Sequence, residues 1–476
     1  MSEFRRQHPV AAVTQLLAVL RQNFITFLLV IFFGSRNTGE YFWYFFLFGI
    51  VMAAVLGVFS WFRFYYRVIG SELQIKKGIF IRKNIYLSKD RIQVINITEG
   101  FIQRLFGLVS VEVKTAGSGT ENAKINAISR TEAEELRTVL RTTDEPAYVG
   151  IEEEEVVIKS KYPFRSLSAK QLMIAALTSG NFGVIASILG AISGQMDELI
   201  NQENVEYVMD HVPMVNTGSV WLEFFILLFV VSYLLSIGGV ILRFYNFKVE
   251  KKEKELHITS GLLERKNITV PFNRIQAIRF VEGVLRQPFG YGMLYVESAG
   301  FEQKDQHKSL VLFPLIRKDQ LEQFFNEFIP EYYVPEESIK PPERAFIKYL
   351  RKPNYILIPL VPLVWYFWSF GWLLFFLMIP LALYGRQRFK DAELSFDSHL
   401  MKLQYRVFAK TTALVRRNRV QVSDLSVNPF QRRKDLCHLT ITAASGAGGK
   451  LFSLHDMDGA SAMKAAKWAG SSDKVN

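Results

Sequence analysis

The sequence predicts an α+β membrane protein with six transmembrane helices in three hairpins, each followed by a small cytoplasmic β-sandwich or barrel that ends in a helix. Three observations predict this fold class. Long uncharged apolar segments alternate with polar stretches, a block of sequence recurs along the chain, and the basic residues gather in the polar stretches. The composition agrees, because 14% of the 476 residues are aromatic and 40 are Phe.

The apolar segments predict the hairpins, since about 20 apolar residues cross a bilayer as a helix. Uncharged stretches lie at 41–62, 171–192 and 224–242. The partner of the first stretch, at 16–33, contains Arg21, which we expect to reach the interface. The third pair, between 355 and 384, is short and contains three prolines, so it predicts a tilted, kinked or partly re-entrant hairpin.

The distribution of Lys and Arg predicts the orientation. Of the 57 basic residues, seventeen lie in 63–169, nineteen in 243–353 and sixteen in 384–476, whereas the loop 193–219 has none and carries five acids. This loop is therefore expected outside the cell membrane, and both termini and all three β-rich units are expected in the cytoplasm. The net charge of +12 then reflects topology and attraction to an anionic phospholipid surface. Nucleic-acid binding is disfavoured, because acids are interspersed and no recognisable motif for it occurs.

An internal repeat defines the β-rich units. Residues 78–117 align without a gap with 261–300, at an offset of 183, and sixteen of the forty positions are identical. A fainter third copy follows at an offset of 145 and has Lys434-Asp435 where the first two copies have Phe106-Gly107 and Phe289-Gly290. Within a copy, alternating β-branched and polar residues predict strands, Gly78 and Gly261 predict tight turns, and an amphipathic segment such as 131–140 predicts the closing helix.

The repeat resembles the bacterial membrane-flanked domain, which has a PH-like fold. The resemblance lies in the strand pair around Gly78 and Gly261, the Arg-Ile-Gln run at 91–93 and 274–276, and the segment 103–117. The whole chain resembles the YdbT-like bacterial membrane proteins with three such domains. The resemblance implies no catalytic residues and no cofactor. It implies a plasma-membrane location, a smaller membrane-flanked PH-like protein as partner, and a context of tolerance to envelope-active compounds. Homo- or hetero-oligomers are also compatible with it.

The predicted organisation follows from the hairpins and the resemblance. It comprises transmembrane hairpin 1 at 10–62, PH-like domain 1 at 63–145, an acidic linker at 146–169, transmembrane hairpin 2 at 170–243 with the acidic extracellular loop 193–219, PH-like domain 2 at 244–332, a linker at 333–353, transmembrane hairpin 3 at 354–384 and a divergent PH-like domain 3 at 385–470.

The repeated Arg-x-Gln motif is the first candidate site. Its members are Arg91 and Gln93, Arg274 and Gln276, and Arg419 and Gln421. In a strand, residues i and i+2 share a face, so each pair predicts a polar row able to bind phosphate or a partner's backbone. The alternative, that the side chains pair with turn carbonyls and fix the fold, is preferred because the motif recurs in all three copies.

The basic loop of the third copy is the second candidate site. Arg432, Arg433 and Lys434 are expected to contact anionic lipid headgroups. No metal-ligand spacing, phosphate loop or nucleophile elbow occurs, so we expect neither a metal site nor enzymatic activity. Two functions stay open: a scaffold or binding protein that presents three domains at the cytoplasmic face in envelope maintenance, and a protein that binds lipid or moves it between leaflets.

Overall fold

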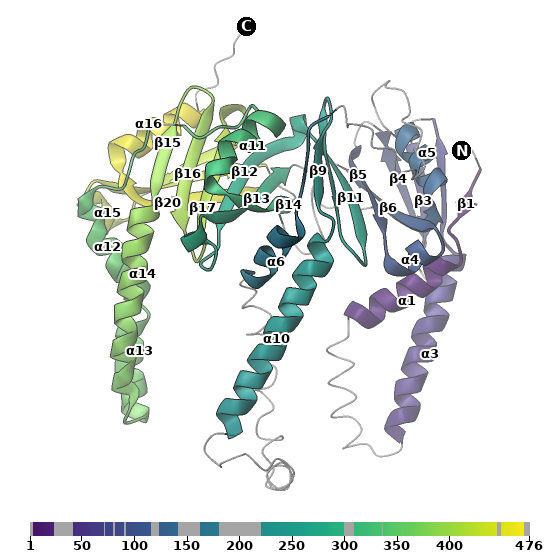
Figure 1. Cartoon of the computed structure of the whole chain (residues 1–476), viewed down its shortest axis with the longest axis horizontal. Helices are drawn as coiled ribbons and strands as arrows, with labels where there is room; N and C mark the ends of the chain where they lie inside the picture. Colours follow the sequence, from purple (N-terminus) through teal and green to yellow (C-terminus); the bar gives the residue numbers. More distant parts are fainter. Residues whose placement is uncertain are drawn as a thin grey trace.

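The computed structural model describes residues 3–22, 41–70, 72–79, 81–89, 92–115, 123–140, 162–179, 220–298, 309–335, 337–444 and 449–470. These residues form a mixed α/β structure whose strands make four antiparallel sheets of four, seven, six and three strands. The sheets form a continuous layer, and helical segments extend from one side of it (Figure 1).

Three β-rich units, which we call units 1, 2 and 3, make up this layer. Unit 1 contains β2 (Tyr65–Ile69), β3 (Glu72–Lys77), β4 (Lys83–Ser88), β5 (Ile92–Glu99), α4 (Phe101–Leu105), β6 (Leu108–Thr115), β7 (Ala123–Ser129) and α5 (Arg130–Leu140). Unit 2 contains β9 (Lys248–Lys251), β10 (Glu255–Ser260), β11 (Arg265–Pro271), η2 (Phe272–Arg274), β12 (Ile275–Glu282), η3 (Gln287–Phe289), β13 (Tyr291–Ser298), β14 (Leu310–Arg317), η4 (Lys318–Gln320) and α11 (Leu321–Phe328). Unit 3 contains β15 (Glu393–Phe396), β16 (Leu400–Arg406), β17 (Lys410–Arg416), η8 (Arg417–Arg419), β18 (Val420–Ser426), α15 (Pro429–Arg432), β19 (Leu436–Ala443), β20 (Lys450–Asp458) and α16 (Gly459–Gly470).

A helical segment precedes each unit. The described helices are α1 (Val10–Gln22) and α3 (Tyr41–Phe62) before unit 1, α6 (Ala169–Leu177) and α10 (Val220–Phe244) before unit 2, and η5 (Glu343–Ala345), α12 (Phe346–Arg351), η6 (Lys352–Asn354), α13 (Leu357–Phe367), η7 (Gly371–Leu377) and α14 (Met378–Asp391) before unit 3. The chain ahead of each segment pairs with the first strand after it. Two short strands, β1 (Arg5–Arg6) and β8 (Phe164–Ser166), pair with β2 and β9, and Ile339 bridges Leu394 of β15. Each helical segment is thus held at both ends by the sheet layer.

The prediction of six transmembrane helices in three hairpins is wrong. Within the residues that the structure describes, no helix combines the length and the apolar composition that crossing a membrane requires. In the third predicted hairpin, α13 has only 11 residues and ends at Phe367, and the chain then forms the 3₁₀ helix η7 from Gly371. An apolar stretch of sequence therefore does not by itself fix the length of a helix. Residues 23–40 and 180–219, which contain much of two predicted helices and the acidic loop, lie outside the described residues.

Neighbouring units share their sheets. Strand β5 of unit 1 pairs with β11 of unit 2, and β12 of unit 2 pairs with β17 of unit 3, both antiparallel. The second sheet of one unit therefore continues into the first sheet of the next. The pair Glu99 and Arg265 at the first junction corresponds, through the offsets of the repeat, to the pair Glu282 and Lys410 at the second. Both junctions therefore have the same register.

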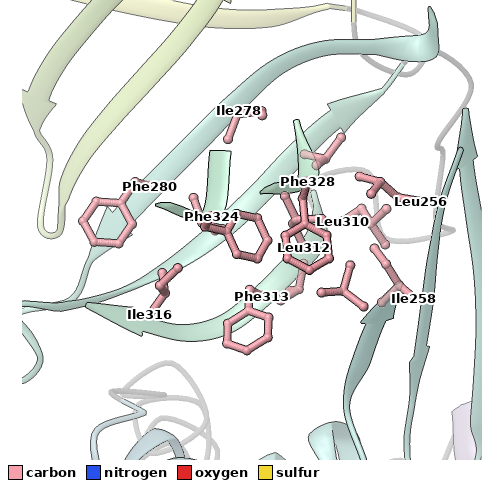
Figure 2. Close-up of a cluster of buried hydrophobic side chains, with 14 of the residues drawn as sticks. Leu256, Ile258, Ile278, Phe280, Leu310, Leu312, Phe313, Ile316, Phe324 and Phe328 are labelled. Carbon is pink, nitrogen blue, oxygen red and sulfur yellow. The ribbon is translucent and has the colours of Figure 1, made fainter. Parts of the chain in front are cut away.

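The largest hydrophobic core of the described residues lies in unit 2. Figure 2 shows Phe313 of β14 near Phe324 and Phe328 of α11, and the rings of Phe324 and Phe328 stack with centroids 4.7 Å apart. Leu414 of β17 belongs to this core, whereas Ala277 of β12 belongs to the core of unit 3. The strands of the second junction thus contribute one face to each of two cores, which couples the stability of units 2 and 3.

Candidate functional site

The Arg-x-Gln motif lies where a turn enters the second sheet of each unit. Arg274 is in the 3₁₀ turn η2, and the buried side chain of Gln276 donates a hydrogen bond from Nε2 to the main-chain oxygen of Arg274 at 3.1 Å. The pairing register of β12 shifts between Ile275 and Ala277, so Gln276 lies at a β-bulge. This contact joins the motif of unit 2 to its own turn.

The motif of unit 1 lies largely outside the described residues, whereas that of unit 3 is described. Arg91 lies outside the described residues, and Gln93 is in β5 with its side chain outside them. In unit 3, Arg419 is in the turn η8, and Gln421 is exposed at the equivalent bulge between Val420 and Val422. Since the Arg of these described copies precedes the strand, the rule that i and i+2 share a face does not apply to the pair. Ligand binding by this motif stays a prediction.

The basic loop of unit 3 is exposed at Arg432, Arg433 and Lys434. The loop follows the short helix α15, whose first turn is capped by Asn428 Oδ1, which accepts a hydrogen bond from the main-chain N–H of Gln431 at 2.8 Å. Lys348 of α12 donates to the main-chain oxygen of Phe430 at 3.1 Å. The backbone of the loop is therefore fixed while its three cationic side chains extend into solvent.

Exposed apolar side chains accompany this loop and its equivalents in units 1 and 2. Phe289 is 67% exposed, Phe430 is 73% exposed and Phe408 is 81% exposed, which is unusual for phenylalanine. We call the full set the helix-side rim. Its members are Ile81, Phe101, Leu105 and Phe106 in unit 1, Leu262, Leu263, Val284, Leu285 and Phe289 in unit 2, and Val407, Phe408, Val427 and Phe430 in unit 3.

The rim lies beside the helical segments. The N–H of Leu262 donates to the main-chain oxygen of Leu242 in α10 at 2.9 Å, and the hydroxyl of Tyr384 in α14 donates to the main-chain oxygen of Val407. Figure 1 shows α4 and α15 on the side of the sheets from which the helices extend. Each of the three units therefore exposes apolar side chains near the helical segments, and exposed apolar surface of this kind marks an interaction site.

Buried polar side chains hold the rim in place. The offsets of the repeat put Gln103, Arg286 and Gln431 at the same position, and all three are buried. Gln103 Oε1 accepts from the N–H of Gly100 at 2.9 Å, and Gln431 Oε1 accepts from the N–H of Asn428 at 3.0 Å. Both contacts stabilise the first turn of the short rim helix. No motif marks this position in the sequence, but the alignment of the three copies brings the three polar residues together.

Arg286 connects the rim of unit 2 to its helical segment. Its guanidinium donates to the main-chain oxygens of Ala175 at 2.8 Å and Pro314 at 3.1 Å, and to the hydroxyl of Thr178 at 3.0 Å. Burial lowers the pKa of Arg286 from its ordinary value. The cation lies at the C-terminal end of α6, where the helix dipole favours positive charge.

A cluster of titratable groups lies beneath the basic loop. The rings of His438 and His455 pack edge to face with centroids 4.7 Å apart, and Gln431 Nε2 donates to the buried carboxylate of Asp456 at 2.7 Å. Burial, together with Lys352 nearby, lowers the pKa of His455 to about 4, so this side chain is neutral at neutral pH. Among the residues that the structure describes, no group of three or more His, Cys, Asp or Glu side chains is arranged to hold a metal ion.

Three β-rich units with a closing helix, joined in line and each preceded by a helical segment, define a class of protein built from one repeated module. The family of bacterial PH domains matches residues 12–143, 204–331 and 355–471, and the chain belongs to this family. The chain is 31% identical to the transmembrane protein YdbT of Bacillus subtilis over 495 aligned positions, which cover 98% of both proteins. This relative is described as an UPF0699 transmembrane protein, in agreement with the resemblance seen in the sequence. No solved structure matches the chain.

Proposed function

We propose that this chain is a non-enzymatic scaffold of the cell membrane that presents its three PH-like units at the cytoplasmic face. The observation that carries the proposal is the helix-side rim, because all three units expose large apolar side chains beside the helical segments. Apolar side chains next to basic ones are the combination that binds the interface of an anionic membrane. The similarity to a protein named as a transmembrane protein supports the same location.

The helices add apolar surface on the same side. Trp43 and Phe48 in α3, Leu235 in α10 and Tyr366 and Phe367 in α13 are exposed. We propose that this surface contacts the hydrocarbon of the bilayer while the rim contacts the headgroups. The sheet layer then stays in the cytoplasm, where a smaller membrane-flanked PH-like protein is the expected partner in envelope maintenance or in tolerance of envelope-active compounds.

The basic loop of unit 3 provides the test of lipid contact. We expect the segment 427–435 of the full chain to exchange its amide hydrogens more slowly when phosphatidylglycerol is added to phosphatidylcholine nanodiscs. Reversing the charges of Arg432, Arg433 and Lys434 to Glu should abolish this difference, since each basic residue near the surface contributes about 1 kcal/mol. Hydrogen exchange followed by mass spectrometry measures the effect.

A matched control is available on the opposite side of the layer. Lys464 and Lys467 lie in α16, which is remote from the helical segments (Figure 1). Reversing both charges should leave the lipid-dependent protection of 427–435 unchanged. Equal protection in both lipid mixtures, or an equal loss in the α16 variant, would contradict headgroup contact by the loop.

A further inference from the structure

The two junctions inside the chain follow one rule. At the first junction, β11 of unit 2 pairs with β5 of unit 1, and at the second, β17 of unit 3 pairs with β12 of unit 2. In both cases the last strand of a unit's first sheet pairs with the first strand of the preceding unit's second sheet. The register is the same at both, and an acid lies opposite a base in each case, Glu99 opposite Arg265 and Glu282 opposite Lys410. Lys410 Nζ and Glu282 Oε2 are 3.4 Å apart. One mode of association is therefore used twice.

Each of these two kinds of edge strand occurs once more in the chain, as β4 and as β18, and there it lacks the partner strand that it has at a junction. Strand β4 of unit 1 is equivalent to β11 and β17, and it is the last strand in its sheet order. Strand β18 of unit 3 is equivalent to β5 and β12, and it is the first strand in its sheet order. Within the described part of the chain, each of these strands pairs with a strand on one side only.

The open edges carry exposed apolar side chains. Tyr86 in β4 is 59% exposed and Val422 in β18 is 54% exposed. At the second internal junction, the residues equivalent to Ser423 and Tyr86 are Ile278 and Leu414, which face each other and are both buried. Strand edges with exposed apolar side chains are templates for pairing with a further strand. The exposure of Tyr86 and Val422 thus marks the place that a neighbouring unit would cover.

We infer that β18 of one copy of this chain pairs antiparallel with β4 of a second copy, so that the sheet layer continues from molecule to molecule. Copying the internal register puts Ser423 opposite Tyr86 and Val422 opposite Leu87. A second copy is the occupant that the structure favours, because this chain carries both edges and already joins their equivalents twice. The contact is heterologous, so its repetition gives a ring or an open row.

The geometry of the internal junctions also suits a membrane. All three helical segments extend from one side of the layer (Figure 1). A second copy joined in the same register therefore keeps its helical segment on that side as well. One feature makes the external contact weaker than the internal ones: Val427 takes the position of the acid, so Arg82, which keeps the position of the base, faces no acid. The expected association is therefore reversible.

Disulfide cross-linking between copies tests the pairing. The full chain is first given Cys437→Ala, because Cys437 is a buried free cysteine. Tyr86→Cys and Ser423→Cys are then made separately, with different tags, and the two variants are co-expressed and oxidised in membranes. We expect a covalent dimer that carries both tags. Antiparallel partners that face each other bring their Cβ atoms to about 4.5–5.5 Å, close enough for a disulfide after a small adjustment.

The controls separate this contact from random collision. Either variant expressed alone should give no covalent dimer, because a heterologous contact does not bring a residue next to its own copy. Thr98→Cys with Lys266→Cys, which face each other at the first internal junction, should cross-link within one chain and show that the layer is folded. The inference is overturned if the mixed variants give no more dimer than the single ones, or if Ser423→Cys cross-links only to a different protein.

Discussion

Replacing Arg406 with Met will destabilise unit 3 by about 3–5 kcal/mol, because the substitution removes one partner of a buried ion pair. Arg406 Nε donates to Asp391 Oδ2 at 2.5 Å, and both residues are buried. The same guanidinium donates to Gln287 Oε1 of unit 2 at 2.5 Å and to the main-chain oxygen of Phe408 at 3.1 Å. One side chain therefore connects the end of α14, the rim of unit 3 and the turn η3 of unit 2.

The size of this loss of stability depends on the carboxylate of Asp391, which stays buried without its cation. Without Arg406, the carboxylate of Asp391 keeps Gln387 as a neighbour at 3.3 Å but has lost its cation. Replacing both members, Arg406→Met with Asp391→Leu, should cost less than Arg406→Met alone, since no buried charge is then left. The difference between the single and double variants measures the penalty of the unpaired carboxylate.

The measurement is hydrogen exchange of unit 3 under native conditions, because several coupled units need not unfold in one step. Arg317→Met is the matched control. Arg317 forms an exposed ion pair with Asp319 at 2.9 Å, and such pairs contribute only about 0–1 kcal/mol. A loss of less than about 1 kcal/mol on replacing Arg406, as small as that of an exposed pair, would show that this residue does not hold the helical segment to the layer.

Replacing Arg286 with Leu will release helix α6 from unit 2. The substitution leaves the main-chain oxygens of Ala175 and Pro314 buried without these donors, at about 1–3 kcal/mol for each. We expect faster hydrogen exchange over 169–179 and a loss of stability of about 3 kcal/mol in unit 2.

Arg104→Leu is the control for this variant. Arg104 is an exposed arginine of the corresponding rim helix in unit 1, and its replacement should change stability by less than about 0.5 kcal/mol. Unchanged exchange over 169–179 in the Arg286 variant would mean that α6 is held by its apolar contacts alone, including those of Ala175 and Ala176.

The local turns could be predicted from sequence because glycine is needed there. Gly78 and Gly261 have φ of +115° and +111°, and a Cβ atom at Gly261 would lie 2.0 Å from the main-chain oxygen of Glu264. Any other residue would be strained at such a turn. The third copy has Arg406 at the equivalent position, so this signal is lost and the buried ion pair could not be anticipated from the repeat.

The junctions between units could not be predicted, because the paired strands are far apart in the sequence. The sequence of strand β12 does indicate a strand between two cores, because it has apolar residues on both faces, and these are buried. Its sequence also contains Arg279, which pairs with Glu297 at 2.6 Å, and this interruption hides the pattern. The prediction of six membrane-spanning helices was wrong for a related reason, since apolar composition does not show where a helix ends.

The position of the rim relative to lipid decides whether the three units lie at the membrane surface. An environment-sensitive fluorophore is attached to Phe430→Cys or to Met463→Cys in the full chain carrying Cys437→Ala, reconstituted with anionic vesicles that contain brominated lipid. Phe430 belongs to the rim, whereas Met463 is exposed on α16 at the opposite side of the layer. If the rim contacts the headgroups, the emission at position 430 will be blue-shifted and quenched by bromine, whereas the emission at position 463 will be aqueous and unquenched. An aqueous emission at both positions would contradict it.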